Sequence, residues 1–114
     1  MTSLVASLGV GKGTWGHVAR VIAAEDWSTV LLLSSDFGKE NFKPEKECEW
    51  ILMNNRAGFE IIKDAVKERL PEGEIVLSLA SGSGKEHMAI LAALREVGRE
   101  FKIVTLTGDG IKYY

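Results

Sequence analysis

Two short glycine-rich stretches, each containing a lysine, are the parts of this chain best suited to hold an anion. The first is GVGKGT at 9–14, and the second is SGSGK at 81–85. Glycine lets backbone N–H groups approach a ligand closely, and lysine adds a mobile positive charge. Where such a turn opens a helix, the helix N-terminus also favours negative charge. Both stretches therefore predict a site for a nucleotide or another phosphate-bearing molecule.

Each stretch is preceded by a strand-like segment and followed by a helix-like one. Residues 3–8 predict a buried strand, and residues 14–25 carry apolar side chains at helical spacing. Around the second stretch, residues 74–79 predict a strand and residues 85–97 a helix. The positions expected to face inward on that helix are Met88, Leu91, Ala92 and Leu94.

The rest of the chain continues this alternation. Further elements are expected as strands at 29–34, 48–54 and 101–106, a helix at 59–70, and a possible short edge strand within 108–114. The charged segment 36–47 contains Pro44 and reads as a loop. The alternation predicts the α/β class: a three-layer Rossmann-like sandwich in one domain, 1–114, with a mainly parallel sheet of about five strands.

The two glycine-rich stretches also belong to an internal correspondence. A shift of 73 residues places Gly9 on Gly82, Gly11 on Gly84 and Lys12 on Lys85. The identities are few, so the correspondence indicates physical equivalence rather than common ancestry. In a doubly wound sheet, the first strand of each such unit lies near the centre, where a crevice opens at the carboxyl ends. We therefore expect both stretches to face one site.

Composition narrows the functional classes. The chain has 114 residues and a net charge of −2, which argues against bulk attraction to long nucleic acid or to an anionic membrane. The N-terminal segment lacks the pattern of a signal peptide, and no apolar run approaches a membrane span. Cys48 is the only cysteine and is expected to fill space in the core. We expect a cytoplasmic protein with no cofactor and no metal site.

The candidate ligand-binding residues are those of the two stretches together with two aspartates that follow predicted strands. They are Gly9, Gly11, Lys12, Gly13, Thr14, Ser81, Gly82, Ser83, Gly84, Lys85, Asp36 and Asp109. The aspartates could bind a ribose or an exocyclic amine, or could cap turns. His17 and His87 lack metal-ligand spacing and are expected to be packing or surface residues rather than bases.

A phosphotransferase P-loop is one interpretation of the first stretch. ASLGVGKGT at 6–14 resembles the kinase-type pattern GxxGxGKGT, with Ala6 in place of the first glycine. Gly13 stands where the Mg²⁺-binding serine or threonine is expected, although Thr14 could substitute. The chain is also short for a nucleotide kinase, and this interpretation leaves the second stretch unexplained. It therefore ranks second.

The second stretch carries a family resemblance. SLASGSGKEHMAILAALREVG at 78–98 resembles the fourth-strand motif of the CRISPR-associated Rossmann-fold (CARF) domains, in which a strand ends in Thr/Ser-Gly-Gly-Thr/Ser-Lys before an Ala- and Leu-rich helix. The segment LVASLGVGKGTWGHVARVI at 4–22 is similar to the first CARF strand and its turn. The second stretch departs from the pattern by reading Gly-Ser-Gly instead of adjacent glycines.

The resemblance implies a homodimer that binds a cyclic oligoadenylate messenger in CRISPR-associated antiviral defence. The chain would be a stand-alone sensor or a metal-independent ring nuclease, in which a ribose 2′-hydroxyl attacks the adjacent phosphate. Lys12 and Lys85 would then neutralise developing charge, and Ser7, Ser81 and Ser83 would orient the reacting groups. The candidate catalytic residues are Lys85, Ser7 and Lys12. A phosphotransferase and an assembly domain without a ligand remain alternatives.

Overall fold

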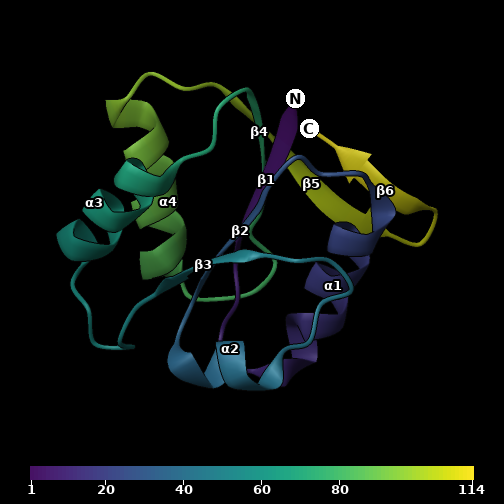
Figure 1. Cartoon of the computed structure of the whole chain (residues 1–114), viewed down its shortest axis with the longest axis horizontal. Coiled ribbons are helices and arrows are strands. Elements are labelled where there is room, and N and C mark those ends of the chain that lie inside the picture. Colours follow the sequence, from purple (N-terminus) through teal and green to yellow (C-terminus); the bar gives the residue numbers. More distant parts are fainter.

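Strands and helices alternate from β1 to β5, as the sequence predicts (Figure 1). The computed structural model describes all residues, 1–114. The strands are β1 (Thr2–Ser7), β2 (Val30–Ser34), β3 (Glu49–Leu52), β4 (Glu74–Ser78), β5 (Phe101–Thr107) and β6 (Gly110–Tyr113). The helices are α1 (Trp15–Ala24), α2 (Asp36–Asn41), α3 (Phe59–Arg69) and α4 (Gly84–Glu96), with a 3₁₀ turn over Lys12–Thr14. None of these helices combines the length and apolar character needed to cross a bilayer.

The sheet has the order β3-β2-β1-β4-β5-β6, in which only β6 is antiparallel to its neighbour. The expected three-layer Rossmann-like sandwich is confirmed, and the C-terminal edge strand is present as β6. The chain turns one way from β1 through β2 to β3, and the other way from β4 to β5. The crevice expected of a doubly wound sheet therefore opens between β1 and β4, at their carboxyl ends.

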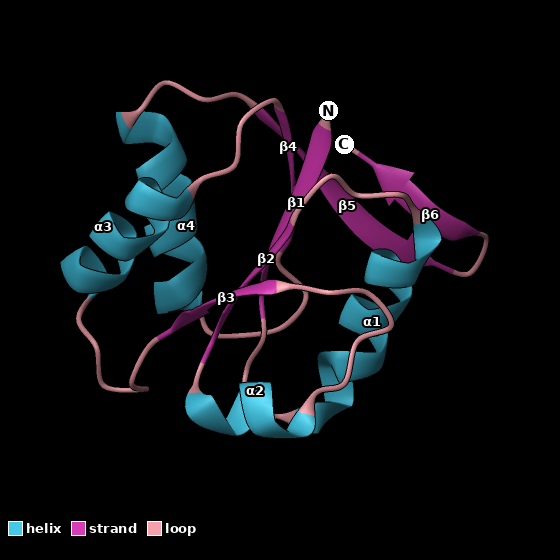
Figure 2. Cartoon of the chain, in the orientation of Figure 1, coloured by secondary structure: helices cyan, strands magenta, loops and turns pink.

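Helices cover the two faces of the sheet (Figure 2), with α3 and α4 on one side and α1 on the other. The central strands alternate between two cores because successive side chains of a strand point to opposite faces. Leu4 and Ala6 pack into the cluster that contains Val18 of α1. Val5 packs into a second cluster, which contains Ile62 of α3 and Ile90 of α4. Such burial on both faces explains the continuous apolar runs in these strands.

The helices α3 and α4 lie side by side, and an ion-pair cluster joins their exposed edges. Lys63 and Lys67 of α3 both contact the carboxylate of Glu96 on α4, at 2.7 and 3.0 Å. These contacts, the Lys63 hydrogen bond first, hold the pKa of Glu96 below its usual value. Lys67 and Glu96 are partly exposed, and ion pairs at a protein surface contribute little to stability.

Two sequence expectations about local structure are wrong. The segment expected to be a loop at 36–47 begins with the short helix α2, which Ser35 starts by accepting a hydrogen bond from the N–H of Gly38. Met88, expected to face inward on α4, is 58% exposed. The buried positions of α4 are Ala89, Ile90, Ala93 and Leu94. Apolar residues surround most of α4, so spacing alone did not define which face is buried.

Candidate functional site

The first glycine loop (residues 8–14) and the second glycine loop (residues 79–85) meet at the carboxyl edge of the sheet. They meet because β1 and β4 are adjacent, parallel and in register, with Ala6 opposite Ser78. The N–H of Gly9 donates a 2.8 Å hydrogen bond to Oγ of Ser81. The hydroxyl of Ser7, just before the first loop, donates to the carbonyl of Ser81. The two loops are therefore one joined structure, as their expected adjacency requires.

Two glycines permit this close approach. A Cβ on Gly9 would lie 2.8 Å from the backbone nitrogen of Gly82, which is closer than such atoms approach in proteins. Gly82 itself has a φ of +96°, in the region that favours glycine. A Cβ there would lie 3.0 Å from the side chain of Ser7. Side chains at these two positions would push the loops apart.

His87 contacts both residues that link the two loops, Ser7 and Ser81. Nε2 of His87 lies 2.7 Å from the carbonyl oxygen of Ser81 and 3.0 Å from Oγ of Ser7. A carbonyl oxygen only accepts hydrogen bonds, so Nε2 carries a hydrogen and is the donor. Nε2 therefore has no lone pair with which to take a proton from Ser7. This arrangement is structural, and it does not form a nucleophile–base pair.

Above the joint lies a cavity of about 600 Å³ that both loops line. Its lining includes Gly9, Gly11, Gly13 and Thr14 from the first loop, and Ser81, Gly82, Ser83 and Lys85 from the second. The segment between β3 and α3 supplies a third wall, with Met53, Asn54 and Asn55. The cavity therefore brings together most of the predicted ligand-binding residues.

The helix starts beside the cavity differ in how their backbone is satisfied. At α4, Ser83 accepts from the N–H of Glu86, and the Glu86 carboxylate accepts from the N–H of Ser83 at 2.7 Å. At α1, Thr14 is the N-cap residue, and its side chain makes no capping hydrogen bond. The first-turn N–H groups of a helix have no partner within the helix. A 3₁₀ turn over Lys12–Thr14 leads into α1, and the N–H of Trp15 donates to the carbonyl of Lys12. The uncapped start in this loop is therefore that of the 3₁₀ turn, at Gly11, where no side chain makes a capping hydrogen bond.

The two predicted lysines occupy different positions. Lys85 lines the cavity, and its Nζ lies 3.5 Å from the carbonyl oxygen of Asn55. Lys12 is absent from the lining, and its Nζ lies 5.7 and 5.5 Å from the ring centres of Trp15 and Phe37. Lys85 is therefore placed to contact a bound anion directly, whereas Lys12 is held on an aromatic pair.

The remaining predicted site residues are dispersed. Ser7 is fully buried beneath the cavity, so the structure does not support its expected direct role in catalysis. Gly84 is the first residue of α4 and is not part of the lining. Asp36 begins α2 and lines a smaller neighbouring cavity. Asp109 lies in the turn between β5 and β6, 3.9 Å from Lys112, and does not reach either cavity.

The sequence reasoning missed three contributions. The wall formed by Met53, Asn54 and Asn55 follows β3, whose carboxyl end lies on the same edge as the loops, so topology alone could have indicated it. Trp15 donates from its ring N–H to the carbonyl of Gly9 at 2.7 Å and so anchors the first loop. The polar role of His87 has no sequence signal, because it depends on side-chain orientation.

The surroundings of Cys48 and His17 give both side chains a packing role and not a chemical one. Cys48 is half-buried, and burial raises the pKa of its thiol to about 11, which disfavours the nucleophilic thiolate. Nε2 of His17 accepts a hydrogen bond from the N–H of Leu106 at 3.2 Å. This hydrogen bond lies in the part of β5 that extends past the residues paired with β4. His17 is a packing residue, as expected, whereas Cys48 packs against the edge of the core and does not fill its interior.

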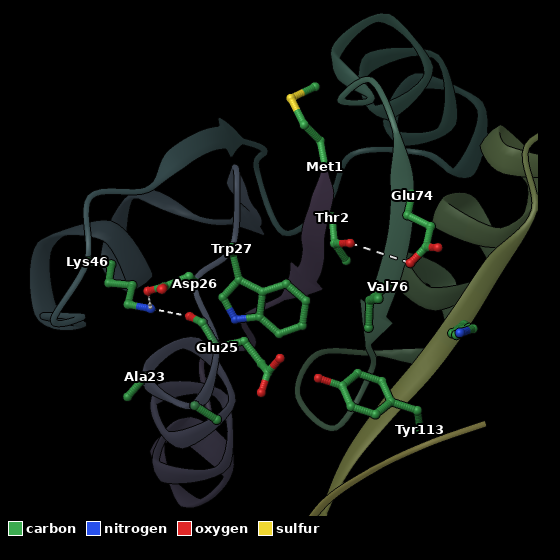
Figure 3. A pocket seen from close by; sticks show the side chains of 12 residues that line it. Met1, Thr2, Ala23, Glu25, Asp26, Trp27, Lys46, Glu74, Val76 and Tyr113 are labelled. Carbon is green, nitrogen blue, oxygen red and sulfur yellow. Dashed lines mark hydrogen bonds and ion pairs between the residues drawn. The ribbon is translucent and has the colours of Figure 1, made fainter.

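A larger cavity of about 720 Å³ lies at the opposite, amino edge of the sheet (Figure 3). Trp27 and Tyr113 form its aromatic walls, with Glu25 between them. Lys46 neutralises Asp26 at 3.7 Å and also donates to the carbonyl of Glu25. Charges of both signs line this cavity, and it has no glycine-rich backbone. The smaller cavity at the carboxyl edge is therefore the better candidate site.

Comparison with protein-family models and with curated proteins gives no match for this chain.

Proposed function

We propose that this chain is a nucleotide-binding domain whose ligand places a phosphate or phosphodiester group between the two glycine loops. The observation that carries the proposal is that the two glycine loops are hydrogen-bonded to each other and line one cavity, with Lys85 in its wall. Paired glycine-rich turns at the switch point of a doubly wound sheet are suited to phosphate groups, because backbone N–H groups, a helix start and an ammonium converge there.

Local geometry has to supply the attraction, because the chain is slightly acidic overall. A bound phosphate would gain charge-assisted hydrogen bonds from Lys85 and from backbone N–H groups of the 3₁₀ turn that follows Gly11, whose start no side chain caps. Such bonds are roughly twice as strong as those between neutral groups. This balance favours a small phosphate-bearing ligand in a fixed position over long nucleic acid held by a diffuse field.

The CARF resemblance narrows this ligand to a cyclic oligoadenylate. A ring of nucleotides presents several phosphodiesters, and two copies of the site would hold it symmetrically. We therefore include a homodimer in the proposal. Sedimentation should show a dimer at micromolar concentration, and a monomer at high micromolar concentration would contradict this part.

Within the family, the geometry favours a sensor over a ring nuclease. Ser7 is buried beneath the cavity, Lys12 lies on aromatic rings, and the Glu86 carboxylate is engaged in the helix cap. Lys85 is the one candidate catalytic side chain that lines the cavity. The lining carries one cation, Lys85, and one carboxylate, Glu86, which the helix cap holds. Such a cavity is equipped to bind, and cleavage would depend on positioning the ligand's own hydroxyl.

Calorimetric titration with cyclic oligoadenylates of several ring sizes tests the proposal. Saturable binding, with the ring recovered intact after incubation in EDTA, is the expected result. Loss of the ring in EDTA would replace the sensor by a nuclease. Binding and turnover that require Mg²⁺ and a nucleoside triphosphate would instead select the phosphotransferase. If no phosphate-bearing nucleotide bound, the remaining interpretation would be an assembly domain without a ligand.

A further inference from the structure

A second cavity, of about 310 Å³, adjoins the one between the glycine loops. The two cavities share the wall formed by Met53, Asn54 and Asn55. The other side of the second cavity is formed by the start of α2, with Asp36 and Phe37. A ligand with its phosphate on the glycine loops could therefore extend past the shared wall into this second space.

We propose that the second cavity is a base subsite for an aminopurine, which stacks on Phe37 and donates its exocyclic amine to Asp36. This inference rests on the proposed function, since it assigns the other end of the same ligand. It names the base class through chemistry on α2, a helix that the glycine loops do not include.

The apolar part of the subsite is exposed. The side chain of Phe37 is 43% exposed, and Leu52, which also lines the cavity, is 38% exposed. Phe37 lies 6.0 Å from Trp15 between ring centres, and Nζ of Lys12 lies 5.5 Å from the Phe37 ring centre. A stacked base would therefore displace Lys12 from Phe37 or use the opposite face of the ring. Every nucleobase has a π-face, so an exposed aromatic ring beside a phosphate site favours stacking.

The polar part of the subsite consists of groups without a partner in the protein. The carboxylate of Asp36 makes no ion pair or hydrogen bond, and neither does the side-chain amide of Asn55. A carboxylate only accepts, so it selects a base edge with N–H donors. An asparagine amide can pair with an adenine edge that offers both a donor and an acceptor. Together these groups favour an amine-bearing purine over uracil.

The backbone holds α2 in position for this task. Gly38 lies against β2, where an added Cβ would overlap Oγ of Ser34 and come within 3.3 Å of Leu8. The Ser35 cap fixes the start of the helix. Asp36 and Phe37 are therefore presented by a tightly seated turn of helix. Rigid presentation reduces the entropy cost of binding.

Titration of the intact chain with inorganic phosphate, adenosine, AMP, GMP and purine riboside monophosphate tests the subsite. Phe37→Ala should weaken AMP binding roughly tenfold, within the range of base–aromatic stacking, and leave phosphate binding unchanged. Phe37→Tyr keeps the ring and should retain AMP affinity, which separates stacking from any loss of fold. Asp36→Ala should abolish the preference for AMP over purine riboside monophosphate, which lacks the amine. The matched control Glu40→Ala, at an exposed position on the same helix, should preserve it.

The outcomes separate the two proposals. AMP binding no tighter than phosphate, or equal weakening of both by Phe37→Ala, would overturn the subsite. Weakening of every phosphate-bearing probe by Lys85→Ala would support the site between the glycine loops independently. Binding of adenosine without binding of phosphate would support the subsite and contradict the proposed function. Tighter binding of GMP than AMP would support an aminopurine subsite and overturn the adenylate assignment.

Discussion

The first and second glycine loops have corresponding sequences, but the second is closed by its own side chains and the first is not. In the second loop, Ser83 and Glu86 exchange hydrogen bonds around the start of α4. In the first loop, Thr14 contributes no side-chain cap to α1, and Trp15 donates from its ring N–H to Gly9 and from its backbone N–H to Lys12. The second loop is therefore closed at its helix start by its own side chains, whereas no side chain caps the 3₁₀ turn or the helix that follows the first loop.

The two lysines follow the same division. Lys85 reaches the cavity, whereas Lys12 rests on Trp15 and Phe37. An exposed contact between a cation and an aromatic ring contributes about 0.5–1 kcal/mol. This energy is small enough for Lys12 to be displaced by a ligand that competes for its charge. The comparison teaches that matching sequence positions need not carry equal shares of binding.

We expect the largest effect from a substitution that adds a side chain where the two glycine loops touch. Gly82→Ala combines a φ of +96° with an overlap onto Ser7. We expect it to lower the free energy of unfolding by about 2–4 kcal/mol, the sum of backbone strain and repacking. Urea denaturation measures this effect. Gly84→Ala in the same loop is the control, because nothing lies within 4 Å of its added Cβ and the backbone is helical.

The unequal lysines give an effect on affinity. Lys85→Ala should weaken cyclic oligoadenylate binding by about 1–3 kcal/mol, the scale of a charge-assisted contact. Lys12→Ala should cost less than about 1 kcal/mol, because its ammonium starts outside the cavity. Calorimetric titration with both variants decides the point. Equal losses would show that the first loop contributes its lysine fully, and an unchanged affinity for Lys85→Ala would move the site elsewhere.

The smallest expected effect is the loss of stability when the N-cap residue of α4 or of α1 is replaced. Ser83→Ala removes the side chain that accepts from the N–H of Glu86 and should cost about 1 kcal/mol of stability. Thr14→Ala removes an N-cap side chain without a capping bond and should change stability by less than about 0.5 kcal/mol. Thermal unfolding of the ligand-free variants measures both. Similar losses in the two variants would contradict the difference between the loops.

The sequence was sufficient to predict the arrangement of the loops because that arrangement follows from topology. Alternating strands and helices imply a parallel sheet, and the corresponding stretches at Gly9 and Gly82 then fall at its switch point. The same reasoning failed for Asp109 because β5 leaves the parallel sheet to pair with β6, and so carries its end away from the cavity.

Side-chain direction and short elements were beyond the sequence patterns. The helix α2 has six residues, too few to show a helical period, and its sequence contains Gly38 and Asn41. Met88 was assigned inward because the helix α4 is apolar on several sides. The position of Lys12 depends on two aromatic rings, one of which comes from a different element. None of these features leaves a periodic signal.

The two ends of the chain lie together at the amino edge of the sheet, away from the glycine loops (Figure 1). Met1 and Tyr113 line the same cavity. A short flexible linker could therefore join the ends, and circular permutants could be opened in an exposed connection such as 43–47. For the same reason, a fluorophore or a surface tether attached at either end would leave the glycine loops facing outward. With the proposed nucleotide binding, this geometry would suit the domain to a reagentless biosensor.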